Sequence, residues 1–255
     1  MFRFAPMQRY FLELAYDGTN FFGWQVQPNQ RTVQAEIETA LSKLYSNEKV
    51  GVTGCGRTDT GVHASQYFLH FDAIERYGVE DLKHKLNGML PTDIAVYRVI
   101  PIEKEIHARF DADKRTYTYY ISQEKNPFTI KNSWYKRLNL DLNKMNEASK
   151  MCIGKKDFEC FSKVHTEVNN FLCEVFECEW RFENNQYIFK VSANRFLRNM
   201  VRAMVGTFIE VGLGKINLEQ FDKILKSKDR SEAGSSVPAQ GLFLSEVKYD
   251  GLNNV

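Results

Sequence analysis

The chain lacks long apolar runs and is poor in proline, and each shortage excludes a class of protein. Among its 255 residues are 6 Pro and 15 Gly, too few for a collagen-like or low-complexity chain. No apolar stretch approaches the ~20 residues that a membrane helix needs, and the opening MFRFAPMQRY lacks the apolar core of a signal peptide. We therefore expect a folded protein that does not contact a membrane and is located in the cytoplasm.

Cysteine is also scarce. There are 5 cysteines, an odd number, and their spacing gives none of the CxxC pairs of a zinc framework. Clustered carboxylate or histidine ligands are absent from the sequence motifs as well, which argues against a metal-dependent nuclease. We expect five reduced thiols packed in or near the core, at Cys55, Cys152, Cys160, Cys173 and Cys178.

An excess of charge of either sign is missing too. With 34 Lys and Arg against 32 Asp and Glu, the formal net charge is +2. A polyanionic partner would therefore be held by a local basic patch and not by the field of the whole molecule. What the chain does have is 43% hydrophobic and 13% aromatic residues, enough at this length to bury a sizeable core without disulfides or metals.

Hydrophobic periodicity predicts a β-α-β-β-α-β order in the first half of the chain. Extended segments are expected near residues 10–16, 50–55, 66–72 and 94–100, and helices near 33–44 and 79–87. Thr32 is placed as the N-cap of the first helix. Gly88 and Pro91 are expected to end the second helix.

The second half repeats this order of elements, although no residue-level repeat can be read. A strand is expected at 115–122, a helix at 142–152, a hairpin at 171–194 that turns at 183–186, helices at 196–211 and 218–225, and a last strand at 242–249. The sequence therefore predicts an α+β fold of two split-βαβ halves, with mixed or antiparallel sheets flanked by helices. We expect domains at 1–110 and 111–255 and a functional cleft between them.

The segment GCGRTDTG, residues 54–61, carries the clearest chemical signal. Its three glycines within eight residues let the backbone approach a ligand or another chain closely. It lacks the Gly-Lys-Ser/Thr ending of a P-loop and the G-x-G-x-x-G spacing of a dinucleotide loop, and a strand is expected to follow it. The segment presents Arg57 and Asp59, and a nearby guanidinium favours an ionised carboxylate. Asp59 thus suits a nucleophile or general base; the alternative is a carboxylate that accepts backbone N–H bonds and braces a turn.

The longer segment GRTDTGVHA resembles GRTDAGVHA, the signature of the TruA family of tRNA pseudouridine synthases. The difference is Thr60, which stands where alanine is usual. Other family motifs follow in order, at YDG (16–18), FGWQ (22–25), VQ (33–34), HARF (107–110), RTYTY (115–119), NRFL (194–197) and GLFL (241–244). The resemblance extends over nearly the whole chain, from Tyr10 to Tyr249.

This resemblance implies an enzyme that converts uridine to pseudouridine in the anticodon stem-loop of tRNA, at positions 38 to 40. It also implies a homodimer without cofactor or metal, in which two RRM-like halves flank a basic cleft. Asp59 corresponds to the family's nucleophile and Arg57 to the arginine linked to base flipping. Tyr117, Arg202 and Leu242 correspond to the active-site tyrosine, the late-helix arginine and the active-site leucine. Whether the aspartate attacks C1′ or C6, or only removes a sugar proton, stays open.

Periodicity predicts a two-sided helix around the corresponding arginine. At 100° per residue, Arg195, Arg198, Arg202 and Gly206 fall on one face and apolar residues on the other. Such a basic face is usually just solvated, but the family match connects Arg202 with the catalytic carboxylate, and Arg195 and Arg198 are expected to contact phosphates. Gly206 leaves room for another backbone or for the RNA.

Strand alternation places Tyr117 on the same face as Arg115 and Tyr119. A flipped base can stack on Tyr117, whereas Tyr119 is interpreted as core packing. Leu242 is expected either to form an apolar floor under the uracil or to belong to the core. His63 is interpreted as structural or RNA-contacting, because the reaction does not need a second titrating group.

Two other functions fit parts of the pattern. A non-catalytic RNA-binding protein could use the same basic cleft, and a hydrolase could act on a nucleoside. The intact GRTD sequence argues against the first. The hydrolase would need a paired general acid, and the glycine-rich loop motif contains no acidic residue besides Asp59 for that role.

Overall fold

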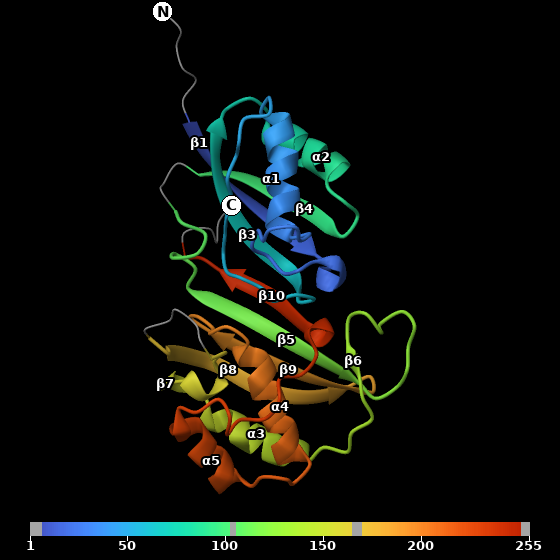
Figure 1. Cartoon of the computed structure of the whole chain (residues 1–255), viewed down its shortest axis with the longest axis vertical. Helices are drawn as coiled ribbons and strands as arrows, with labels where there is room; N and C mark the ends of the chain where they lie inside the picture. The colour runs from blue at the N-terminus through green and yellow to red at the C-terminus, as the bar shows by residue number, and fades with distance from the viewer. Residues whose placement is uncertain (1–6, 103–105, 165–169, 251–255) are drawn as a thin grey trace, which may run out of the picture. The chain divides into compact units, whose positions relative to one another are not determined.

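The chain folds into two compact units. This computed structural model describes residues 7–102, 106–164 and 170–250 (Figure 1). The first unit comprises Met1–Asp113 and Leu244–Val255, and the second comprises Lys114–Phe243. The sequence predicts two consecutive domains, 1–110 and 111–255. In the structure, the segment after Phe243 instead returns to the first unit. It is held there by hydrogen bonds such as that from the Tyr249 hydroxyl to the carbonyl oxygen of Ala108, at 2.6 Å.

The first unit has the predicted β-α-β-β-α-β order. Its elements are β1 (Met7–Tyr16), the 3-10 turn η1 (Gly18–Asn20), α1 (Val33–Leu44), β2 (Thr53–Gly54), β3 (His63–Ile74), α2 (Val79–Met89) and β4 (Ile94–Ile102). The strand order is β4-β1-β3-β10, and β2 pairs with β3. Strand β1 therefore has a strand on each side, with Phe11 opposite His70 and Leu12 opposite Val99. Both Phe11 and Leu12 are fully buried.

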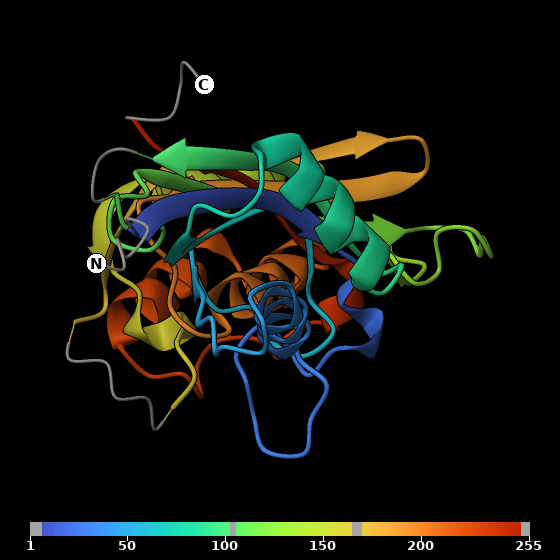
Figure 2. The ribbon, with the colours of Figure 1, turned by 90° about the horizontal axis from the view of Figure 1, so that it is seen from above.

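The ends of the two helices follow from local chemistry. Thr32 is the N-cap of α1, as predicted, and its hydroxyl oxygen accepts a hydrogen bond from the backbone N–H of Ala35 at 3.4 Å. Figure 2 shows α1 end-on beneath strand β1. The expectation that Gly88 ends α2 is wrong, because the helix continues through it. The helix ends before Leu90, whose extended backbone is the conformation favoured ahead of Pro91.

The second unit has a sheet whose long strands pair antiparallel, one short strand paired in parallel, and three helices on one face (Figure 1, Figure 2). Its elements are β5 (Lys114–Ser122), β6 (Trp134–Tyr135), α3 (Leu142–Met151), β7 (Gly154–Asp157), η2 (Glu159–Phe161), β8 (Leu172–Glu183), β9 (Gln186–Ala193), α4 (Met200–Gly212), α5 (Leu218–Ser227), η3 (Ala239–Gly241) and the start of β10 (Leu242–Lys248). The strand order is β5-β9-β8-β7. The predicted hairpin is confirmed: β8 and β9 meet at a turn in which Asn184 and Asn185 have φ of 50° and 58°. The fold class is α+β, as expected.

Helix α4 differs from its prediction. It begins four residues later, because Asn199 takes a left-handed φ of 66° at its N-cap, and residues 195–198 are not helical. Arg195 and Arg198 therefore do not share a helix face with Arg202, and the predicted two-sided helix is wrong. Of the 13 residues of α4, all except Arg202 and Glu210 are buried, so α4 is a core helix.

All five cysteines are buried free thiols, as expected. Burial raises the pKa of Cys160 to about 12 and that of Cys173 to about 11, so these two thiols are inert at neutral pH. Within the described part of the chain, no group of His, Cys, Asp and Glu side chains is placed to hold a metal ion. Nor is any helix there long and apolar enough to cross a membrane.

A buried histidine with a strongly lowered pKa lies in the first unit. His70 is 7% exposed; its ring stacks on Phe11, and its Nδ1 accepts a hydrogen bond from the backbone N–H of Ala108 at 3.0 Å. Burial, and then the nearby charges of Arg9 and His107, lower the pKa of His70 from 6.5 to about 4. The folded protein therefore keeps this imidazole neutral at a pH where the unfolded chain would protonate it.

We expect this imidazole to make stability depend on pH. As the pH falls from about 6.5 to about 4, only the unfolded chain gains the proton, so the free energy of unfolding should decrease, by at most about 3 kcal/mol. His70→Asn keeps an acceptor for the Ala108 amide but does not titrate. Urea denaturation of the unchanged protein and of the variant across this pH range should show a smaller decrease in the free energy of unfolding for the variant. Equal decreases in the two proteins would contradict the assignment of this pH dependence to His70.

Candidate active site

A tight turn places Asp59 in the first unit. The backbone N–H of Val62 donates to the carbonyl oxygen of Asp59 at 3.1 Å, and Gly61, the third residue of the turn, has φ of 76°. This positive φ is the conformation that favours glycine at the third position. Arg57 is exposed and Asp59 half-buried. The loop thus presents both charged groups, as the sequence predicts.

Thr58 anchors the loop between these two residues. Its side chain is buried, and its hydroxyl lies 2.8 Å from the hydroxyl of Tyr16 on β1. Its carbonyl oxygen accepts a hydrogen bond from the backbone N–H of Trp24 at 3.2 Å. The backbone on one side of Arg57 is therefore held by two separate segments.

Gly56 is held on the other side of Arg57. Its carbonyl oxygen accepts a hydrogen bond from the hydroxyl of Tyr67 on β3, and the Tyr67 ring stacks on Trp24 with centroids 4.2 Å apart. Tyr16 and Tyr67 also contact one another, at 5.6 Å between ring centroids. A cluster of three aromatic rings, Tyr16, Trp24 and Tyr67, thus supports the loop from within the first unit.

Two glycines let the segment after β1 pack directly on this loop. A Cβ at Gly23 would lie 2.4 Å from the carbonyl oxygen of Thr58, and Gly23 also has φ of 86°. A Cβ at Gly18 would lie 2.0 Å from the carbonyl oxygen of Val62. Both positions exclude a side chain, because the atoms they would strike are backbone. The glycines of the YDG and FGWQ motifs therefore have a packing role.

His63, at the start of β3, is buried and makes a structural hydrogen bond. It is 1% exposed, and its Nδ1 accepts a hydrogen bond from the backbone N–H of Gly18 at 3.1 Å. The carboxylate oxygen Oδ1 of Asp17 lies 3.1 Å from the same nitrogen. The hydrogen bond from Gly18 fastens the segment after β1 to the start of β3.

In the second unit, β5 carries Tyr117. Regular antiparallel pairing of β5 with β9 preserves the predicted alternation, so Tyr117 and Tyr119 share a face. Tyr117 is half-exposed and meets the ring of Phe196 edge-on, with centroids 5.1 Å apart. Tyr119 is fully buried and donates its hydroxyl hydrogen to the carbonyl oxygen of Pro238 at 2.7 Å. The core interpretation of Tyr119 is confirmed.

Arg202 is tied to the segment that leads into β10. Its Nε donates to the carbonyl oxygen of Val237 at 2.7 Å, and its own carbonyl oxygen accepts from the backbone N–H of Val237 at 3.3 Å. One turn further along α4, a Cβ at Gly206 would lie 1.9 Å from the carbonyl oxygen of Ser235. The space that Gly206 leaves is therefore filled by the protein's own backbone. Leu242 ends this segment and is 5% exposed.

The predicted site residues thus fall into two groups. The first unit holds Arg57 and Asp59 on one loop, and the second unit holds Tyr117, Arg202 and Leu242. Within the second unit, residues 234–242 connect Arg202 with Leu242 and also accept the hydrogen bond of the Tyr119 hydroxyl.

The roles of Tyr16, Thr58 and Tyr67 as supports of the loop are not predicted from the sequence. Their hydroxyl groups lie in strands or in the loop itself, where periodicity indicates only which side chains face the core. The usable signal was their chemistry: tyrosine and threonine need a hydrogen-bond partner when they are buried.

Comparison with known proteins points to one family. Residues 14–111 and 148–250 match a family model described as tRNA pseudouridine synthase. A protein of Parabacteroides distasonis named tRNA pseudouridine synthase A is 47% identical over 244 residues, which cover 95% of this chain and 96% of that protein. The protein of the same name from Bacteroides thetaiotaomicron is 46% identical over 246 residues, covering 95% and 91%. That of Bacillus pumilus is 40% identical over 240 residues, covering 93% and 97%.

A solved structure was also found, the crystal structure of a Cbf5-Nop10-Gar1 complex. It aligns with a TM-score of 0.33 at 13% identity, over 79% of this chain and 54% of that chain. This likeness is too weak to carry an argument.

Proposed function

Because this chain belongs to the family of tRNA pseudouridine synthases, we propose that it modifies the anticodon stem-loop, at positions 38 to 40, and that Asp59 is its nucleophile. The enzyme is an isomerase that converts uridine to pseudouridine in tRNA. The observation that carries the finer proposal is the loop at residues 54–62. It presents a half-buried Asp59 beside an exposed Arg57, on a loop held by two tyrosine hydroxyls, one on the Thr58 side chain and one on the Gly56 carbonyl oxygen.

The reaction needs little more than such a carboxylate. The N1–C1′ bond breaks, the uracil turns, and a C5–C1′ bond forms; C5 loses a proton and N1 gains one, so no oxidant or reductant is required. Asp59 can attack C1′ or C6, or remove a sugar proton, and a base is then needed for the proton on C5. A fixed loop backbone suits this chemistry, because the carboxylate must meet one atom of the substrate at bonding distance.

The other residues have roles in binding the substrate. A uridine in a paired stem must be unstacked at a cost of a few kcal/mol, and the exposed Arg57 side chain can enter the RNA to take the place of the base. Tyr117 provides a half-exposed ring on which a base can stack. Arg202 binds the substrate through its guanidinium, and the buried Leu242 forms the apolar floor under the uracil. We also propose a homodimer located in the cytoplasm, as the family resemblance implies.

Mapping the modification tests this function. We would incubate the purified protein with anticodon stem-loop transcripts that carry uridine at positions 38, 39 and 40, label pseudouridine chemically, and locate it by mass spectrometry. Pseudouridine at one or more of these positions is expected. Binding without modification would instead favour a non-catalytic RNA-binding protein, and modification elsewhere would refute the proposed position.

Gly23→Ala should impair catalysis by displacing the loop. The new Cβ would lie 2.4 Å from the carbonyl oxygen of Thr58, and alanine tolerates φ of 86° poorly. We expect the single-turnover rate to fall at least about tenfold, because an error of about 1 Å in position can cost far more than that. The control is Gly51→Ala, where a Cβ meets nothing within 4 Å. Equal rates for both variants would contradict this packing role.

A further inference from the structure

Residues 123–133 form an eleven-residue loop of the second unit between β5 and β6. We call it the arm. Strand β5 ends at Ser122, and the chain returns at Trp134, which pairs in parallel with Ile121. Figure 1 shows the arm as the green loop beside β6. The two ends of the arm thus meet on the same strand.

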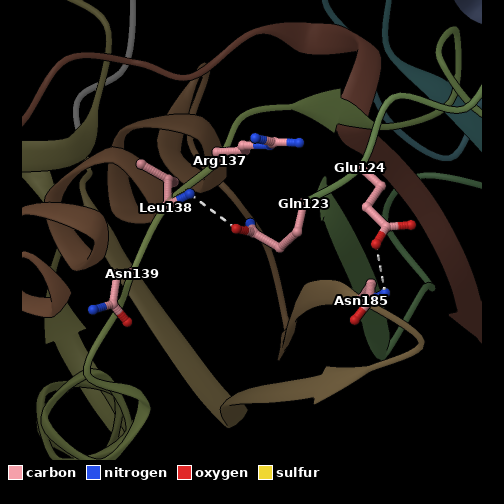
Figure 3. A pocket seen from close by; sticks show the side chains of 6 residues that line it. All are labelled: Gln123, Glu124, Arg137, Leu138, Asn139 and Asn185. Carbon is pink, nitrogen blue, oxygen red and sulfur yellow. Dashed lines mark hydrogen bonds between the residues drawn. The ribbon is translucent and has the colours of Figure 1, made fainter.

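Hydrogen bonds fasten the base of the arm. Gln123 donates from Nε2 to the carbonyl oxygen of Lys136 at 3.0 Å and accepts at Oε1 from the backbone N–H of Leu138 at 2.9 Å. Glu124 Oε1 accepts from Nδ2 of Asn185 at 3.0 Å. Figure 3 shows the bonds of Gln123 with Leu138 and of Glu124 with Asn185. They border a hollow of about 500 Å³ lined by Gln123, Glu124, Arg137, Leu138, Asn139 and Asn185. The arm therefore starts from a defined base.

The arm also has internal order, and its tip exposes an aromatic ring. Asn126 Oδ1 accepts from the backbone N–H of Phe128 at 2.9 Å, and the backbone N–H of Thr129 donates to the carbonyl oxygen of Asn126 at 3.2 Å. This Asx turn presents the Phe128 ring, which is 93% exposed. Gln240 Nε2 donates to the carbonyl oxygens of Ile130 and Ser133, at 3.3 and 3.1 Å.

The ring is accompanied by positive charge. Residues 123–137 contain one carboxylate, Glu124, and four cations, all exposed: Lys125, Lys131, Lys136 and Arg137. This short segment carries a net charge of +3, whereas the whole chain carries +2. Two of these cations, Lys125 and Lys131, lie on the arm, and Lys136 and Arg137 follow β6 at its base. The arm and its base together therefore form a local basic patch of the kind that a nearly neutral protein needs to hold a polyanion.

We propose that the arm is a second RNA contact, in which Phe128 stacks on the base of an unpaired nucleotide and the neighbouring cations bind its phosphates. The inference rests on the proposed function, because tRNA supplies unpaired bases within a phosphate backbone. Stacking on aromatic side chains is the general way in which proteins hold unpaired bases. The arm is also joined through Gln240 to the segment that ends at Leu242, a residue of the proposed site.

A second copy of the chain fits this surface less well. One phenylalanine buries about 200 Å², whereas a stable interface needs about 800 Å² from each partner. Among residues 123–137, Phe128 is the one large hydrophobic side chain that is exposed, so the tip has no broad apolar patch. Two such arms would also repel one another through their lysines.

Substitutions of the tip separate stacking from simple apolar contact. Phe128→Leu keeps an apolar side chain but removes the π face, and should weaken tRNA binding at constant salt by about 5- to 100-fold. Phe128→Trp should bind at least as well as the unchanged protein. The matched control is Phe176→Leu at an exposed phenylalanine on β8 of the same unit, and this variant should bind normally. Single-turnover rates at saturating tRNA should be unchanged in all three variants.

A salt titration tests the cations separately. Lys125→Ala combined with Lys131→Ala should reduce the slope of log affinity against log salt by about 1 to 2, because two phosphate contacts are lost. An unchanged slope would overturn this part of the proposal.

The outcomes distinguish the arm from the proposed function. If the unchanged protein makes pseudouridine in the stem-loop but Phe128→Leu binds tRNA equally well, the arm proposal is wrong and the function stands. If no pseudouridine forms, the function fails, and weakened tRNA binding by Phe128→Leu alone would still support the arm. A photo-reactive residue at position 128 should cross-link to RNA. Cross-linking to a second protein chain, with a changed sedimentation coefficient for Phe128→Leu, would overturn the proposal.

Discussion

Asp59→Asn should abolish pseudouridine formation while tRNA binding survives. The amide has nearly the shape of the carboxylate, so the turn from Asp59 to Val62 should persist, since its hydrogen bond joins backbone atoms. An amide neither ionises nor serves as a nucleophile or base, so we expect the single-turnover rate to fall at least about a thousandfold. The dissociation constant for tRNA should change less than about threefold, because one carboxylate contributes little to holding a polyanion.

The matched control is Asp81→Asn, the same substitution at an exposed position of α2 in the same unit. It should leave both the rate and the affinity unchanged. If the Asp59 variant keeps substantial turnover, its carboxylate is not the nucleophile. Loss of turnover together with loss of tRNA binding would instead indicate that the substitution disturbs the loop.

Arg202→Ala should remove most of the activity. Arg202 is one of two residues of α4 that are not buried, and we propose that its guanidinium binds the substrate. We expect the single-turnover rate to fall at least about tenfold. Stability should fall by only about 1 kcal/mol, the usual contribution of a hydrogen bond such as that from Nε to the carbonyl oxygen of Val237. Thermal unfolding would measure the change in stability, and single-turnover assays on the same preparations would measure the change in rate.

Substitution of a second arginine, Arg230, tests whether Arg202 binds the substrate or only supports the backbone of residues 234–238. Arg230 contacts the same segment, donating from Nη1 to the carbonyl oxygen of Ala233 and from Nη2 to the hydroxyl of Ser236. Arg230→Ala should therefore lower stability to a similar extent but leave the rate at saturating tRNA nearly unchanged. Equal losses of rate for both variants would show that Arg202 acts only by holding residues 234–238.

Local signals predicted much of the fold. The N-cap at Thr32 and the turn at Asn184 and Asn185 depend on interactions within a few residues, and both appear where the sequence places them. The predicted start of α4 was wrong because Asn199 takes a left-handed conformation, so the helix begins after it although the apolar periodicity extends further towards the N-terminus. The return of the chain to the first unit after Phe243 depends on long-range pairing, which periodicity does not specify.

The candidate site shows the same division. The charged residues on the loop were found from a glycine-rich motif and a family resemblance, and the structure places both at an accessible loop. The supports of the loop were missed because they depend on strand register: Tyr16 and Thr58 are 42 residues apart in sequence, yet their hydroxyls lie 2.8 Å apart. Aromatic residues in strands are usually interpreted as core, and here the same side chains also carry the hydrogen bonds that fix the loop.

The central claim is that the Asp59 carboxylate performs the chemistry in an anticodon stem-loop. It is tested most directly by single-turnover release of tritium from stem-loop RNA that carries [5-³H]uridine, because tritium leaves C5 only when the C5–C1′ bond has replaced the N1–C1′ bond. The unchanged protein should release the label from positions 38 to 40, and Asp59→Asn, bound to the same RNA, should release none above background. Release by that variant at a rate near that of the unchanged protein would contradict the account.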